Sequence, residues 1–420
     1  MGWGIYVHIP FCRRKCFYCD FPSYAGREGA MERYARALCR EIEIAAQGIT
    51  CPPPRGRGTE FVSIYDIRYT CPPPWGRGTI VDGGGGRTLL PCGRGKASTV
   101  YVGGGTPTAL PQPLFLGILH TLKEKMPIRE DAEWTVEVNP GTVDRAYLEG
   151  LFSCGVTRLS FGVQSFSDTL LRRIGRIHTA QQAREALRLA RDAGFRNLSL
   201  DLIYGLPGQT LENLRESVAE AAALGAEHIS IYGLQIEEGT VFARQQEAGT
   251  LELPHEELVD AMYGYITEEL PRLGYLRYEI SNFAQPGCES RHNLGYWQDV
   301  PYLGLGAAAH SYWQGERRAN PAELDAYMEA LEAGKSPSRL EEPATRSLRM
   351  EEFCFLALRT AKGIEKEAFR KKFGCTVESI YQDAMVRMKA KGLLAEEDGC
   401  LHLTALGMKY GNWVFEEFLL

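Results

Sequence analysis

Three cysteines stand close together near the start of the chain, in a C-x3-C-x2-C pattern. Cys12, Cys16 and Cys19 follow a short β-branched and aromatic run, and Cys19 is followed by Asp20, not by another cysteine. Three thiolates at this spacing can hold three irons of a cubane iron–sulfur cluster and leave the fourth iron open to a small molecule. A zinc site that recruits His8 as a fourth ligand is the alternative, because zinc prefers four nitrogen or sulfur ligands.

The composition is that of a globular protein and points to no charged partner. The 420 residues are 44% hydrophobic and 24% charged, and the formal net charge is -6. This balance gives no reason to expect nucleic acid or an anionic membrane as a partner. No apolar run is long enough for a transmembrane segment, and the first residues lack the apolar stretch of an export signal. We therefore expect a cytoplasmic protein whose 12 cysteines are mostly reduced thiols.

Six short runs rich in β-branched and aromatic residues predict strands, and each is followed by a segment of helical periodicity. The runs cover residues 5–10, 98–105, 134–140, 158–165, 197–207 and 228–235. Such alternation predicts an α/β fold with a parallel sheet, either doubly wound or curved into a barrel. Polar residues and glycines follow the strands. Because the carboxyl ends of parallel strands carry the binding site, we expect these segments to converge.

Residues 50–97 interrupt this alternation. They hold ten glycines, seven prolines and an imperfect repeat, TCPPPRGRGT and TCPPPWGRGT. Loops accept long insertions at small entropic cost, so we interpret the segment as an inserted surface loop. Its seven basic against three acidic residues leave a basic arm for nucleic acid or an acidic partner as the alternative.

Beyond about residue 340 the pattern changes to three helical segments followed by a hairpin with a Glu-Asp-Gly turn. This order is typical of a winged helix, and we predict one over residues 340–420, after a first domain over residues 1–335. A winged helix can read DNA through one of its helices. These helices carry no broad basic face, which favours a packing or partner-binding role and no nucleic acid.

The cysteine loop and the strand-end residues together resemble the radical S-adenosylmethionine (SAM) superfamily. The resemblance implies a partial (β/α)6 barrel of the TIM type, in which Cys12, Cys16 and Cys19 hold a 4Fe-4S cluster. It also implies that the reduced cluster cleaves SAM to a 5'-deoxyadenosyl radical, with electrons from a flavodoxin or ferredoxin-type donor. The positions that match SAM contacts of the superfamily are Tyr6, Tyr18, Gly104, Gly105, Thr106, Glu137, Gln164, Arg176, Asp201 and Gln235.

Outside residues 50–97 the resemblance narrows to two related families, the HemN-type oxygen-independent coproporphyrinogen III dehydrogenases and the HemW-type haem chaperones. The dehydrogenases continue the cluster motif as C-x-C and carry a longer segment ahead of it. This chain has Asp20 and Phe21 after Cys19, and only eleven residues precede Cys12. The segment HNLGYW, which starts at His292, matches the H-N-x-x-Y-W motif of the chaperones.

The H-N-x-x-Y-W segment has a chemistry of its own. A histidine is an ordinary axial ligand of haem iron, and Tyr296 and Trp297 offer flat apolar faces to a porphyrin. We therefore predict a carrier that binds haem through His292 and delivers it to apo-cytochromes, with the cluster and SAM as structural or switching cofactors. The alternative is an enzyme that converts propionates of coproporphyrinogen III to vinyl groups. The sequence assigns no catalytic residue to either.

Overall fold

The computed structural model describes residues 2–50, 95–313, 315–341 and 343–420. Nearly all of the predicted insertion, residues 51–94, lies outside the described residues. A 12-stranded sheet dominates the fold, in the order β12-β11-β10-β9-β1-β2-β3-β4-β5-β6-β8-β7. Among the described helices, none has the length and apolar character needed to cross a membrane.

The six predicted strands are present and neighbour one another in parallel, in sequence order, which confirms the α/β fold and its partial (β/α)6 barrel. They are β1 (Gly4–Ile9), β2 (Ala97–Gly104), β3 (Ile128–Val138), β4 (Arg158–Gln164), β5 (Leu198–Tyr204) and β6 (His228–Gly233). β3 begins at Ile128, six residues before its predicted start at residue 134.

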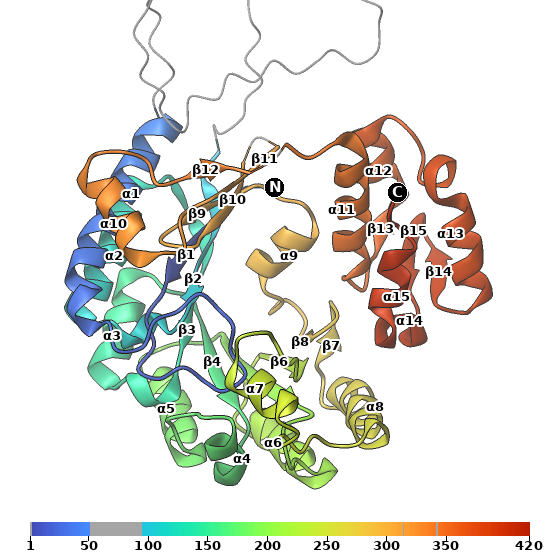
Figure 1. The fold of residues 1–420 in the computed structure, drawn as a ribbon, viewed down its shortest axis with the longest axis horizontal. Helices are drawn as coiled ribbons and strands as arrows, with labels where there is room; N and C mark the ends of the chain where they lie inside the picture. The colour runs from blue at the N-terminus through green and yellow to red at the C-terminus, as the bar shows by residue number, and fades with distance from the viewer. Residues whose placement is uncertain (1, 51–94, 314, 342) are drawn as a thin grey trace, which may run out of the picture.

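Helices follow the parallel strands, and α1, α2, α3 and α5 lie along the outer face of the sheet (Figure 1). The bounds are α1 (Met31–Thr50), α2 (Gln112–Lys125), α3 (Arg145–Cys154), α4 (Asp168–Arg173), α5 (Ala180–Asp192), α6 (Leu211–Ala223), α7 (Val241–Glu247) and α8 (Glu256–Arg272). The starts of α5 and α6 are determined by neighbouring residues. Thr179 and Thr210 each form a capping box with the residue three positions later.

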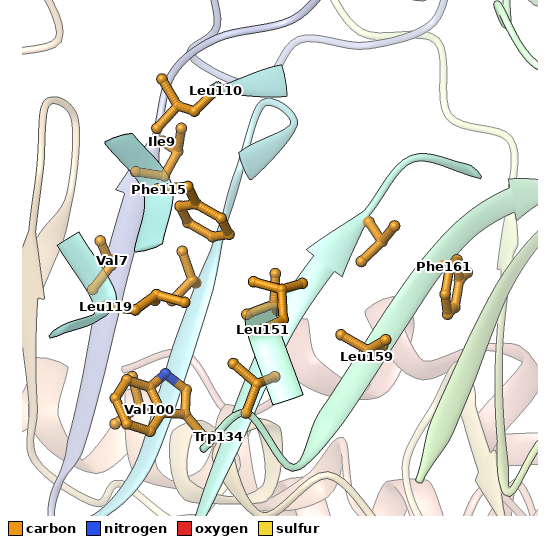
Figure 2. Packing of buried hydrophobic residues seen from close by; sticks show 14 of the residues in the cluster. Val7, Ile9, Val100, Leu110, Phe115, Leu119, Trp134, Leu151, Leu159 and Phe161 are labelled. Atoms are coloured by element: carbon orange, nitrogen blue, oxygen red, sulfur yellow. The ribbon is translucent and has the colours of Figure 1, made fainter. Parts of the chain in front are cut away.

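The main core lies between the sheet and these helices. Figure 2 shows apolar side chains of β1 to β4, such as Val7 and Phe161, facing Leu119 of α2 and Leu151 of α3. All four side chains are fully buried. Replacing such a leucine with alanine costs about 2 to 5 kcal/mol, so this layer holds the strand ends in fixed positions.

Shorter antiparallel strands extend the sheet at both edges. They are β7 (Leu276–Arg277) and β8 (Asn282–Ala284) beside β6, and β10 (His310–Trp313), β11 (Glu316–Ala319) and β12 (Arg339–Leu340) beside β9 (Tyr302–Leu305). β9 itself pairs in parallel with β1. Two further helices in this region are α9 (Arg291–Trp297) and α10 (Leu324–Glu332).

The C-terminal part has a hydrophobic core of its own, with Leu358, Phe369 and Leu401 fully buried. It contains the three predicted helices and the predicted hairpin of the winged-helix-like arrangement, together with a short strand and two terminal helices that the sequence did not indicate. The elements are α11 (Arg346–Leu358), β13 (Ile364–Glu365), α12 (Lys366–Phe373), α13 (Glu378–Ala390), β14 (Leu394–Glu397), β15 (Cys400–Leu403), α14 (Ala405–Lys409) and α15 (Gly411–Glu416). Because this core is separate from the main one, we propose a domain boundary near residue 340.

Candidate functional site

The cysteine loop leaves the carboxyl end of β1 and is anchored at both ends. The Cys12 N–H donates to the Tyr24 carbonyl over 3.0 Å, and the Tyr24 N–H donates to the Pro10 carbonyl over 2.8 Å. In the middle of the loop, the Phe17 N–H donates to the Ile174 carbonyl over 3.1 Å. The loop therefore has a fixed path over the strand ends of the barrel.

The three thiols are half-buried, and two of them lie beside polar side chains from other loops. The Cys12 Sγ lies 3.6 Å from the Thr106 Oγ1, and the Arg176 Nη1 donates to the Cys16 Sγ over 3.5 Å. Burial raises the pKa of Cys12 and raises that of Cys19 to about 11. A cation beside the thiols suits an anionic iron–sulfur cluster, whose thiolate ligands need charge compensation.

A glycine keeps space beside the first thiol. A Cβ added to Gly105 would lie 2.8 Å from the Phe11 carbonyl oxygen and 3.1 Å from the Cys12 Sγ. Both distances are shorter than ordinary contacts, so only glycine lets the backbone approach the cysteine loop this closely. The donor set and this cradle fit a cluster bound to the loop.

The zinc alternative with His8 does not fit the structure. The His8 Nδ1 is 2.9 Å from the Tyr6 Oη and its Nε2 is 2.8 Å from the Pro22 carbonyl oxygen, so both ring nitrogens already have partners. In the described part of the chain, no three His, Cys, Asp or Glu side chains are grouped around a single metal ion. A cubane has several irons and spreads its thiolates further apart than one ion does.

Glu137 at the end of β3 faces the glycine segment. The Tyr101 hydroxyl donates to its Oε1 over 2.8 Å and the Gly104 N–H donates to its Oε2 over 3.1 Å. Burial raises the pKa of Glu137 to about 7, and the nearby Asp201 carboxylate raises it too. Gly104 has a φ of +113°, and a Cβ there would lie 2.7 Å from the His8 ring, so this position requires glycine.

Asp201 on β5 is a second carboxylate of the barrel interior. The Ser160 hydroxyl donates to its Oδ1 over 3.1 Å. Burial raises the pKa of Asp201 to about 6. The raised pKa values bring both carboxylates close to titration at neutral pH. This suits a site that receives a cationic or hydroxyl-bearing ligand.

The backbone is strained at the end of β4, and a buried side-chain donor from Arg176 lies beside it. Gln164 has a φ of +69°, in the left-handed region that a side chain other than glycine rarely adopts. The Arg176 Nη2 donates to the Gly162 carbonyl, whereas its buried Nε has no hydrogen-bond partner among the described residues. A buried orphan donor beside a strained strand end is typical of a ligand site rather than of a packed core.

The structure brings most of the remaining predicted SAM positions to the same end of the barrel. Tyr6 stacks on Tyr101 at 6.3 Å between ring centroids, and burial raises the pKa of the half-buried Tyr18. Gln235 differs from the others because it lies two residues beyond β6 and is exposed to solvent. Tyr101 was missed by the sequence reasoning, although strand alternation places it on the same face as Gly103.

His292 lies at the opposite, amino-terminal end of the strands, near the start of β2. Its side chain is only 3% exposed, its Nδ1 is 2.8 Å from the Thr99 Oγ1 and its Nε2 is 2.8 Å from the Tyr296 Oη. Burial lowers the pKa of His292 to about 3, so the ring is neutral at physiological pH. The ring also stacks on Tyr101 at 5.2 Å between centroids, which links the two ends of the barrel.

The start of α9 is fixed by a residue that the sequence reasoning missed. The buried Glu133 carboxylate accepts the N–H groups of Arg291 and His292, each over 3.1 Å, and the Ser290 hydroxyl accepts the N–H of Asn293. An acidic group at a helix amino terminus is favourable. A cavity of about 300 Å³ lies beside this helix; its lining includes Arg129, Arg291, His292, Tyr296 and Tyr302.

Trp297 is not part of the lining of the cavity beside His292. The Trp297 ring packs against the Arg359 guanidinium of the C-terminal part, 4.7 Å from its centroid. Five residues along an α-helix turn the side chain by about 140°, so Trp297 and His292 occupy different sides of α9. Tyr296, four residues after His292, is on the same side as the histidine.

Comparison with known proteins identifies two families along the chain. A model described as the Radical SAM superfamily matches residues 88–221, and one described as the HemN C-terminal domain matches residues 345–409. The solved structure of coproporphyrinogen III oxidase (HemN) from Escherichia coli, described as a radical SAM enzyme, matches with a TM-score of 0.78 over 99% of this chain and 90% of that chain. At 21% sequence identity, this match shows the shared fold.

Curated relatives extend over the whole chain. The heme chaperone HemW of Bacillus subtilis is 34% identical over 415 residues, which is 99% of this chain and 98% of the relative. The heme chaperone HemW of Escherichia coli is 34% identical over 308 residues, covering 73% of this chain and 69% of the relative. The chain therefore belongs to the HemW family of haem chaperones, within the radical SAM superfamily.

Proposed function

We propose that this protein carries haem, with His292 as an axial ligand, and delivers it to apo-proteins such as apo-cytochromes. The observation that carries the proposal is the setting of His292, a neutral ring held at one nitrogen by Thr99 and turned at the other toward Tyr296 and the cavity beside α9. Ligating histidines are commonly oriented in this way by a hydrogen bond to the second ring nitrogen. The printed names of the full-length relatives support the same function.

Haem entry requires a local rearrangement of Tyr296. The Tyr296 hydroxyl is hydrogen-bonded to the His292 Nε2, which is the atom that an iron would bind. Breaking one such hydrogen bond costs about 0.5 to 1.5 kcal/mol. The cavity of about 300 Å³ is at the lower end of ligand pockets, which span about 300 to 1,000 Å³, so we expect it to widen when haem binds. Arg129 and Arg291 line it and would pair with propionate groups, Arg129 by exchanging its present partner Asp131.

At the other end of the barrel, we propose that Cys12, Cys16 and Cys19 hold a 4Fe-4S cluster. Such a cluster, when bound, supplies one-electron chemistry toward SAM. Arg176 compensates the thiolate charge, and its unpartnered Nε is available to a ligand. We propose the SAM contacts at the positions named from the resemblance, which are Tyr6, Tyr18, Gly104, Gly105, Thr106, Glu137, Gln164, Arg176, Asp201 and Gln235.

We further propose an acidic flavodoxin or ferredoxin as the electron donor to this site. Arg13, Arg14 and Lys15 are consecutive, exposed, and lie within the cysteine loop itself. Their hydrogen bonds go to carbonyl oxygens, and among the described residues no carboxylate pairs with them. An acidic partner is attracted to such a surface.

We propose the cytoplasm as the compartment. The nine cysteines that the structure describes are all free thiols, which fits a reducing environment.

The test is an anaerobic haem titration of the reconstituted full chain, followed by the Soret band. His292→Ala should shift the band or weaken haem affinity. His120→Ala is a control for the loss of a histidine, because His120 on α2 bonds the Cys154 Sγ and does not line the cavity. Identical spectra for the wild type and His292→Ala would remove haem ligation from His292.

The dehydrogenase alternative is tested in the same preparation. Incubation with SAM, a reductant and coproporphyrinogen III should leave the propionates intact when the products are separated by chromatography. Formation of vinyl products, with a HemN-type enzyme as the positive control, would overturn the carrier proposal and favour the enzyme.

A further inference from the structure

The helix that carries His292 lies between the sheet and the C-terminal helices (Figure 1). Its one side presents His292 and Tyr296 to the barrel, and its other side presents Trp297 to the C-terminal part. α9 has only seven residues, which is too short for stability in isolation. Its orientation must therefore come from the contacts at its two ends.

The first contact at the carboxyl end of α9 is a stacked cation. The Arg359 guanidinium lies 4.7 Å from the Trp297 ring centroid, 5.4 Å from that of Phe355 and 5.9 Å from that of Phe415. The Trp297 Nε1 and the Arg359 Nε are both buried without a hydrogen-bond partner in the described part of the chain. Arg359 therefore contacts α9 through its cation–π interaction with Trp297.

The second contact is an ion pair just after the helix. The Lys372 ammonium on α12 pairs with the Asp299 carboxylate, and Asp299 has a φ of +57°, where the chain turns out of α9. In addition, the Ile280 N–H donates to the Arg359 carbonyl over 3.0 Å, so the backbone at Arg359 is fixed to the barrel. Two cations of the C-terminal part therefore hold one end of the short helix.

We infer that Arg359 and Lys372 are positioning residues for the haem ligand, and that they act through α9. Trp297 adjoins Tyr296, whose hydroxyl covers the His292 Nε2. When the two cations hold the end of α9, the side that carries Tyr296 and His292 keeps a fixed orientation toward the barrel. When these contacts are lost, α9 no longer holds the His292 ring in one orientation toward a haem iron, and bound haem is held less firmly. This inference rests on the proposed function, because it presupposes haem at His292.

The test measures the rate of haem transfer from the loaded full chain to apomyoglobin. Arg359→Ala removes the desolvated cation–π contact with Trp297, so it should speed haem release about tenfold and alter the Soret band. Arg359→Lys retains a cation and should restore most of the wild-type rate. Lys391→Ala is the matched control, since Lys391 lies 4.8 Å from the Trp413 ring in the same C-terminal part and touches no residue of α9.

A second variant tests the same inference in case the first one does not fold. If Arg359→Ala does not fold, Lys372→Met, which removes the partner of Asp299, should speed haem release in the same direction. Release at the wild-type rate with an unchanged Soret band, in whichever of these variants folds, overturns the inference. Failure of the proposed function is distinguished by a separate comparison, in which the wild type and His292→Ala would give the same Soret band.

Discussion

The half-buried Glu137 carboxylate should make the stability of the folded protein depend on pH. Its pKa of about 7, against an ordinary value of 4.5, arises first from burial. A carboxyl whose pKa is raised on folding stabilises the folded state while it is protonated. This contribution is fully present below pH 4.5 and is lost as the pH rises through about 7.

The size of the effect follows from the two pKa values. At about 1.4 kcal/mol per pKa unit, the linkage relation gives a loss of about 2.5 kcal/mol in the free energy of unfolding between pH 5 and pH 8. Glu137→Gln is neutral at both pH values and has no such loss. At pH 5, where Glu137 is protonated, the amide resembles the neutral acid and the two proteins should be similarly stable. At pH 8 the variant should be the more stable of the two.

The assay is urea unfolding of the full chain without SAM, at a series of pH values, for the wild type and Glu137→Gln. Tyr101→Phe is a useful companion, because the Tyr101 hydrogen bond lowers the pKa of Glu137 and its removal should move the transition to higher pH. Parallel stability profiles of the wild type and Glu137→Gln from pH 5 to pH 8 would refute the reasoning that burial governs this carboxylate.

Three further predictions concern the cysteine loop and its surroundings. Cys16→Ser should abolish the visible absorption of the anaerobically reconstituted cluster, and a metal analysis that finds zinc alone would contradict the assignment. Gly104→Ala should lower the melting temperature by the equivalent of about 1 to 3 kcal/mol, because a Cβ at a φ of +113° meets the His8 ring; an unchanged melting temperature would argue against this. Combined Arg13→Glu and Lys15→Glu should slow cluster reduction by a flavodoxin at low salt and leave reduction by dithionite unchanged. Equal slowing with both reductants would point to damage at the cluster instead of lost docking.

The parallel strands could be predicted because each leaves a local pattern. The run that includes Val7 and Ile9 is buried at every position except Tyr6, as expected for a central parallel strand, and the cysteine spacing that follows it is equally local. Gly104 and Glu137 could be placed at strand ends for the same reason, since each closes a run of β-branched residues.

The surroundings of His292 could not be predicted, because they come from distant parts of the chain. Thr99 is 193 residues away and Glu133 is 159 residues away, and neither has a local pattern that marks it as a partner. The direction of Trp297 depends on Arg359, which no periodicity within α9 reveals. The sequence motif therefore indicated the residue types of a haem site, but not which of their side chains lie on the same side of α9.

The length of β1 separates the two proposed activities in space. Gly4 at its start lies against His292, and Ile9 at its end leads into the cysteine loop. Five steps of a strand at about 3.3 Å each span roughly 17 Å. Hydrogen abstraction needs the radical carbon and its hydrogen donor in contact, so a porphyrin held by His292 at this distance would lie out of reach of a radical formed at the cysteine loop. One molecule could then hold both haem and radical chemistry without the first being consumed by the second.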